Sequence, residues 1–174
     1  IALLKEILIR YNPPVLAFEN FGYPSVVYGF NPYAIKEYEN AKNNAFARPY
    51  TMDHFRADTL TDLIVRFNAL RDSLGVPTRY MLITETDPER GRREHFQDWL
   101  LWLNSGYFGD ASLWYWFLDV KTVRYDTLHA IDKLANDRFI VGISPSSLVP
   151  AQFDLVLREI TTHPVGGIMI DTFS

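Results

Sequence analysis

The amino-acid sequence predicts an α/β fold of the (β/α)8-barrel, or TIM-barrel, type. Amphipathic helical patterns alternate with short apolar runs that are typical of buried strands. This helix-then-strand order occurs five times in 174 residues, which predicts parallel strands joined by right-handed crossovers. Acidic residues follow several of the apolar runs, as they do at the carboxyl ends of strands in barrel enzymes.

The first half of the chain contains two helix-and-strand units. Its elements are predicted at residues 1–11 (helix), 15–19 (strand), about 32–42 (short helix), 54–74 (helix) and 78–85 (strand). The first helix is predicted from Leu4, Ile7 and Leu8 at helical spacing, and it stops at the sequence NPP. The long helix is predicted from an apolar stripe that includes Ile64 and ends at Gly75.

The second half continues the alternation. Its elements are predicted at residues 93–106 (helix), 111–118 (strand), 122–135 (helix), 138–144 (strand), a helix capped by Ser147, and 166–173 (strand). Five units are too few to close an eight-stranded barrel. We therefore expect residues 1–174 to form a single barrel domain that covers strands four to eight and is incomplete on its N-terminal side. A missing N-terminal barrel half, or another chain, is expected to cover the exposed edge of the first strand.

Composition excludes several classes of function. The chain is 48% hydrophobic and 22% charged, which is typical of a globular domain. Its net charge is −4 without a long basic run, so nucleic acid is not an expected partner. No apolar stretch is long enough to predict a membrane span. The chain has no cysteine and its four histidines lack metal-site spacing, so neither a metal nor a cofactor is expected.

Carboxylates at the ends of predicted strands are the candidate catalytic groups. Glu19 ends the first strand and Glu85 ends the second, so both are expected at the same mouth. Glycosidases use such a pair, one group as general acid and the other as nucleophile or as the base that activates water. Adjacent strands lie about 4.8 Å apart, which is compatible with the closer, retaining arrangement. The alternative for Glu19 is a structural ion pair with a buried arginine.

Aromatic and acidic residues supply the candidate substrate-binding groups, which are Tyr23, Trp114, Trp116, Asp119 and Asp171. Trp114 and Trp116 alternate along one strand and share a face, where they either stack on sugars or pack under helices. Asp171 either binds substrate hydroxyls or caps a turn. No strand is followed by a Gly-rich phosphate loop, which argues against a nucleotide-using enzyme.

Several segments together resemble one known family. They are LLKEILIRYNPPVLAFENFGYP, GFNPYAIKEYENAK, HFRADTLTDLIVRFNALR with Arg56, HFQDWLLWLNSGYFGDASLWYW and VGGIMIDTFS. In this order they resemble the glycosyl-hydrolase-like family related to family 10. The strand motif of that family, Asp-Gly-Ile-His-Phe-Asp-Tyr-Ile-Arg-Tyr-Pro, matches at Glu19, Tyr23 and Pro24, and Gly22 stands in place of its arginine.

The resemblance implies an extracytoplasmic glycoside hydrolase of the bacterial cell surface. Its substrate would be a polysaccharide containing N-acetylated amino sugars, such as denuded peptidoglycan. Glu19 would act as general acid or as a substrate-positioning carboxylate, with Glu85 as its partner and with Tyr23 and Trp116 as the sugar-binding surface. The alternative is a non-catalytic carbohydrate-binding or scaffold domain, which the loss of the family arginine at Gly22 favours.

Overall fold

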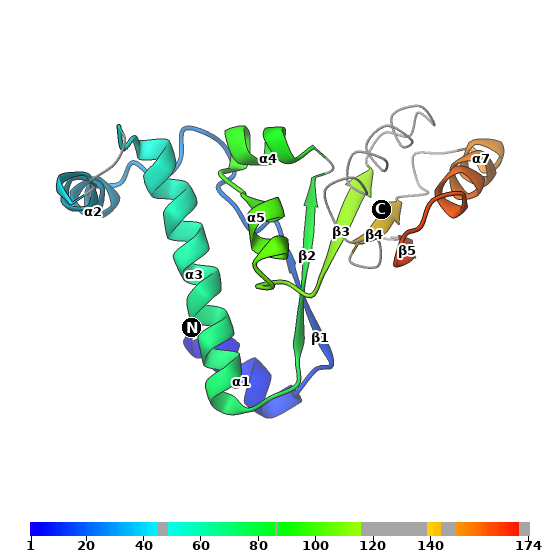
Figure 1. Ribbon diagram of the computed structural model, residues 1–174, viewed down its shortest axis with the longest axis horizontal. Coiled ribbons are helices and arrows are strands. Elements are labelled where there is room, and N and C mark those ends of the chain that lie inside the picture. Colours follow the sequence, from blue (N-terminus) through cyan, green and yellow to red (C-terminus); the bar gives the residue numbers. More distant parts are fainter. Residues whose placement is uncertain (45–48, 86, 116–138, 144–148, 171–174) are drawn as a thin grey trace.

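A parallel β-sheet organises the molecule. The computed structural model describes residues 1–44, 49–85, 87–115, 139–143 and 149–170. The strands are β1 (Val15–Glu19), β2 (Arg79–Glu85), β3 (Asp110–Tyr115), β4 (Phe139–Ile143) and β5 (Gly167–Ile170), and they lie side by side in chain order (Figure 1). All four neighbouring pairs are parallel, which confirms that part of the prediction.

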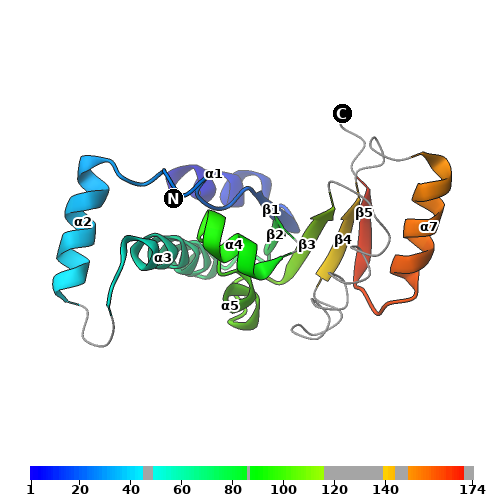
Figure 2. The ribbon, with the colours of Figure 1, turned by 90° about the horizontal axis from the view of Figure 1, so that it is seen from above.

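The sheet is open. Within the described residues, β1 pairs with β2 and β5 pairs with β4, and the two outer strands do not pair with each other. Figure 2 shows these outer strands apart, with α7 beside β5. The prediction of a (β/α)8 barrel covering strands four to eight is therefore wrong, and the chain is a small α/β protein. Alternating helices and strands specify parallel pairing, whereas closure depends on strand tilt and stagger that this alternation does not encode.

The helices of the first half lie where the sequence predicts them. They are α1 (Ala2–Tyr11), α2 (Pro32–Asn43) and α3 (Met52–Leu74). α3 begins with the side chain of Thr51 accepting a hydrogen bond from the backbone N–H of His54. It ends at Gly75, whose φ of 63° is the left-handed conformation that glycine adopts without steric cost. Local capping chemistry therefore fixes both ends of the longest helix.

The helix predicted over residues 93–106 is wrong in its boundaries. The structure has two short helices here, α4 (Pro88–His95) and α5 (Trp99–Asn104). The break falls at Phe96, which has a φ of 58° and ends α4 in the left-handed conformation. α4 begins at Asp87, whose carboxylate accepts hydrogen bonds from the backbone N–H groups of two helix residues. The predicted helix over 122–135 and the cap at Ser147 lie outside the described residues, and α7 spans Pro150–Thr161.

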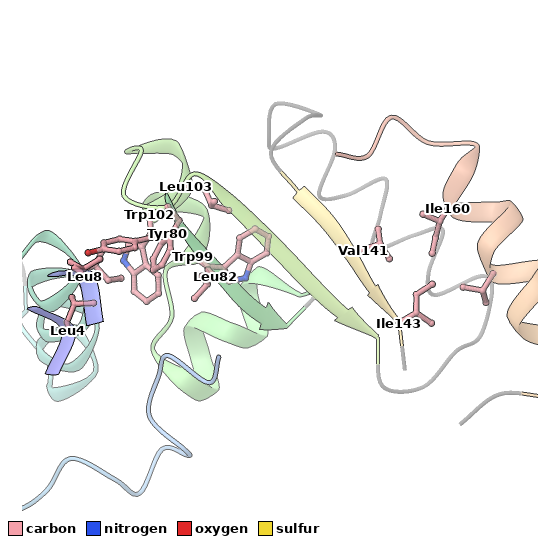
Figure 3. Close-up of a cluster of buried hydrophobic side chains, with 13 residues drawn as sticks. Leu4, Leu8, Tyr80, Leu82, Trp99, Trp102, Leu103, Val141, Ile143 and Ile160 are labelled. Atoms are coloured by element: carbon pink, nitrogen blue, oxygen red, sulfur yellow. The ribbon is translucent and has the colours of Figure 1, made fainter. Parts of the chain in front are cut away.

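One face of the sheet carries the hydrophobic core. On β2, Tyr80 and Leu82 are buried, and their register partners on β1 are Leu16 and Phe18. The helices α1, α3, α5 and α7 all contribute to this cluster, whose fully buried members include Trp99 (Figure 3). Phe18 lies at the centre of an aromatic group, with edge-to-face contacts to Phe21, Tyr80 and Phe108 and a stacked contact to Phe67. Aromatic packing therefore anchors β1 to α3.

At β1 and β2, the opposite face of the sheet is more open to solvent. The alternate residues Val15, Ala17 and Glu19 on β1 are exposed, and Met81 and Ile83 on β2 are half-buried. Because neighbouring residues of a strand point to opposite faces, this row lies away from the helices. None of the described helices is long and apolar enough to cross a membrane.

Candidate functional site

Glu19 lies at the carboxyl end of β1, on the open face of the sheet. Its side chain is exposed, and no ion pair or hydrogen bond to it occurs among the described residues. The buried arginine of this region, Arg56, contacts Asp53 instead, with 3.3 Å between Nη1 and Oδ1. The alternative prediction, a structural ion pair between Glu19 and a buried arginine, is therefore wrong for the described residues. A charged residue ends this apolar strand because its side chain reaches solvent.

The strand register sets the spacing between Glu19 and Glu85. Glu19 pairs with Ile83, so Glu85 lies two residues further along β2 and occupies a position of the same face. Neighbouring strands lie about 4.8 Å apart and each residue advances about 3.3 Å, so the two Cα atoms lie about 8 Å apart. This separation is wider than the spacing of about 4.8 Å between neighbouring strands. The difference comes from the two-residue offset in the register, which the sequence pattern does not report.

The other predicted site residues fall partly within the described structure. Trp114 on β3 is the register partner of Glu85, which places these two backbone positions side by side. Trp116, Asp119 and Asp171 lie outside the described residues. The structure therefore brings three of the predicted positions, at the ends of β1, β2 and β3, to one edge of the sheet.

The loop after β1 is held tightly against the segment that follows α4. Gly22 explains this close approach, because a Cβ atom built there would lie 2.9 Å from the carbonyl oxygen of His95 and 2.9 Å from the Cγ of Gln97. The amide of Gln97 donates to the carbonyl of Phe21 and accepts from the hydroxyl of Thr84 on β2. Position 22 therefore has no room for a side chain unless Gln97 or the backbone at His95 moves.

Tyr23 is anchored by its backbone and its ring. Its N–H donates to the carbonyl of His95, and its own carbonyl lies 2.9 Å from Nδ1 of the same histidine. The ring packs edge-to-face on Phe96, with 5.6 Å between centroids. Burial raises the pKa of the Tyr23 hydroxyl, and the nearby positive charge of Arg56 opposes this shift. Tyr23 therefore helps to attach the loop after β1 to the segment after α4.

Arg56 is the residue of this region whose environment the sequence does not reveal. It lies near the start of α3, and its side chain is 1% exposed. The guanidinium lies over the rings of Phe30 and Phe96, at 4.2 and 4.5 Å from their centroids. Phe30 comes from the loop after β1 and Phe96 from the break between α4 and α5. In the sequence it is an arginine in the second turn of a predicted helix, a pattern that is equally typical of an exposed helix residue.

A surface groove lies between the start of α3 and the α4–α5 segment. Its volume is about 460 Å³, and its lining residues are Asp53, His54, Ala57, Asp58, Arg92, Phe96 and Asp98. The acids of the groove already have partners, since Asp58 accepts from Tyr50 and Asp98 accepts from Arg92. The hydrogen bond from Arg92 to Asp98 raises the pKa of that arginine further above its ordinary value. The groove thus has a polar wall whose acids are engaged in hydrogen bonds or ion pairs, and Glu19 is not among its described lining residues.

Comparison with models of known protein families finds no match for this chain. Comparison with curated proteins likewise finds none. Within the described part of the chain, no group of three or more histidine, aspartate or glutamate side chains is placed to hold a metal ion.

Proposed function

We propose that this protein is a glycoside hydrolase whose carboxylate pair is Glu19 and Glu85. The observation that supports this proposal is the register of β1, β2 and β3, which gathers the two glutamate positions and Trp114 at one edge of the sheet. Carboxylates beside an aromatic ring are the groups that glycosidases use to cleave and to bind sugars. The sequence resemblance supports a polysaccharide of N-acetylated amino sugars as substrate, and an extracytoplasmic location.

The reaction needs one acid and one base. One carboxyl group donates its proton to the glycosidic oxygen as the bond to the anomeric carbon breaks. The other accepts a proton from a water molecule, whose oxygen bonds to the anomeric carbon on the opposite face. By the strand register, the Cα atoms of Glu19 and Glu85 lie about 8 Å apart. Inverting enzymes use separations of roughly 6.5–9.5 Å and retaining enzymes roughly 5–5.5 Å, so inversion is the proposed outcome.

The test is release of reducing ends from a panel of glycans that includes denuded peptidoglycan strands. Glu19→Gln and Glu85→Gln should each lower the rate by about a hundredfold or more, because an amide neither donates nor accepts the required proton. Glu39→Gln is the matched control, since Glu39 is exposed on α2 and should leave the rate unchanged. NMR of the first product should show the inverted anomer. Activity that survives both site substitutions would refute the carboxylate pair.

A second candidate is a carbohydrate-binding protein without turnover. The exposure of Glu19 favours it, because acid catalysts of glycosidases depend on an apolar surrounding that keeps the proton on the carboxyl group. A binder predicts no release from any glycan, together with equal affinity of the wild type and the Glu19→Gln variant for the same strands. Calorimetric titration of both proteins with one glycan distinguishes the two candidates.

A further inference from the structure

Arg56 is a buried cation with incomplete pairing. Its Nη1 contacts Asp53 at 3.3 Å, and the Asp53 side chain is 72% exposed, so this ion pair reaches solvent. Its Nε and Nη2 are buried and have no hydrogen-bond partner. Elsewhere on α3, Arg66 is exposed and lies 2.7 Å from Asp62. Two buried donors without hydrogen bonds on a charged group cost free energy, so a ligand that supplies hydrogen-bond acceptors would bind Arg56 favourably.

The unpaired atoms define the shape of that partner. Nε and Nη2 lie along one edge of the planar guanidinium, and this edge matches the two oxygens of a carboxylate. Phe30 and Phe96 lie against the guanidinium, so a partner that pairs with its edge has to be flat enough to fit between the planes of the two rings, a position that we call the slot. A planar carboxylate fits such a slot better than a tetrahedral phosphate.

We propose that the Nε–Nη2 edge of Arg56 binds a ligand that carries a carboxylate, and that the loop of residues 24–31 is the lid over it. Gly29 in this loop has a φ of 90°, and a Cβ built on it would lie 3.3 Å from Nε of Arg56. The loop backbone thus lies against the unpaired edge. A shift of the loop backbone at Gly29 exposes the edge and lets a carboxylate replace this contact, while the Phe30 ring stays on the face of the guanidinium.

The composition of the loop supports the role of a lid. Its side chains Val26, Val27, Tyr28 and Phe30 are each at least half exposed, although they are apolar or aromatic. Within residues 24–31, one backbone hydrogen bond joins the N–H of Tyr28 to the carbonyl of Ser25. A loop with so few attachments of its own opens at low free-energy cost. Tyr23 and α2 hold its two ends.

This binding site is separate from the carboxylate pair of the proposed hydrolase. The test uses the whole chain and follows the side-chain Nε–H signal of Arg56 by NMR during titration with sodium glucuronate. The signal should shift and saturate with glucuronate, and it should not shift with glucose, which has the same ring without the carboxylate. Sodium phosphate at equal ionic strength should bind at least severalfold more weakly. Absence of a saturable shift, or equal binding of phosphate, would overturn the proposal.

Variants complete the test. Arg56→Lys should weaken glucuronate binding by about tenfold or more, because an ammonium group does not make the paired contact along one edge. Arg66→Lys is the control on the same helix and should bind as the wild type does. If Arg56→Lys does not fold, Phe30→Leu is the second variant. It removes one wall of the slot and should weaken glucuronate binding severalfold. Tyr33→Leu, at a 74% exposed position, should leave that affinity unchanged. Unchanged binding in Phe30→Leu would count against the slot.

Discussion

Replacing Gly22 by alanine tests the close approach between the loop after β1 and the segment after α4. The new Cβ would lie 2.9 Å from the carbonyl oxygen of His95 and 2.9 Å from the Cγ and Nε2 atoms of Gln97. The carbonyl belongs to the backbone and cannot turn aside. Gln97 can move only by losing its hydrogen bonds to Phe21 and Thr84. Both responses are unfavourable, so the substitution should destabilise the fold.

The magnitude follows from three contributions. Overpacking by one methyl group costs about 1–3 kcal/mol. Each hydrogen bond lost by Gln97 adds about 0.5–1.5 kcal/mol. The gain from a less flexible unfolded chain is about 0.4–1 kcal/mol, because Gly22 has no positive φ that alanine would strain. We expect the free energy of unfolding to fall by about 1–3 kcal/mol.

The assay is urea denaturation followed by circular dichroism, with Gly109→Ala as the matched control. A Cβ at Gly109 would come no closer than 3.7 Å to another atom, and its φ is also not positive. Alanine at this position should leave the stability unchanged or raise it by up to about 1 kcal/mol. If Gly22→Ala is as stable as Gly109→Ala, the close approach at Gly22 does not constrain the fold and the reasoning fails.

Two further predictions concern aromatic side chains that are buried or half-buried. Trp102→Phe should cost about 1 kcal/mol more than Trp99→Phe in urea denaturation, because the indole N–H of Trp102 donates to Thr61 at 2.9 Å whereas that of Trp99 is buried without a partner. Equal costs would contradict this. Burial raises the pKa of Tyr23 in the folded state above 10.0, so ionisation of its hydroxyl is less favourable in the folded chain than in the unfolded chain. The stability that this group contributes is therefore fully present below about pH 10, and it is lost as the pH rises through the folded pKa. Tyr23→Phe should therefore show a smaller loss of unfolding free energy above pH 10 than the wild type, and Tyr33→Phe should behave as the wild type.

The features that sequence alone predicts here are those controlled by neighbouring residues. The stripe around Ile64 and the stop at Gly75 specify α3, and the apolar run before Glu19 specifies β1. Each signal acts within a few turns or strand residues. The break at Phe96 cannot be predicted from neighbouring residues, because hydrogen bonds from Gln97 to a distant loop and to β2 hold the chain there. Closure of the sheet cannot be predicted from them for the same reason, since it depends on strands far apart in sequence.

The candidate site shows the same division. The position of Glu19 at a strand end follows from the local pattern, whereas its offset from Glu85 depends on the register between strands. Packing of Phe18 against Phe67 on α3 and Tyr80 on β2 favours this register, and no single segment encodes that packing. Arg56 is less predictable still, because the two rings that enclose it come from separate loops. A helix arginine becomes a buried cation only when those loops fold over it.

The topology places both proposed sites at one end of the molecule. α3 runs back along the sheet before β2 begins, so the start of α3, with Arg56, lies at the edge where β1 ends with Glu19 (Figure 1). The loop after β1 connects the two regions. If one acidic glycan occupied both, the effects of Glu19→Gln and Arg56→Lys on its binding would be coupled in a double-mutant cycle. Additive effects would instead mean that the guanidinium serves a second ligand, and that the loop separates two functions.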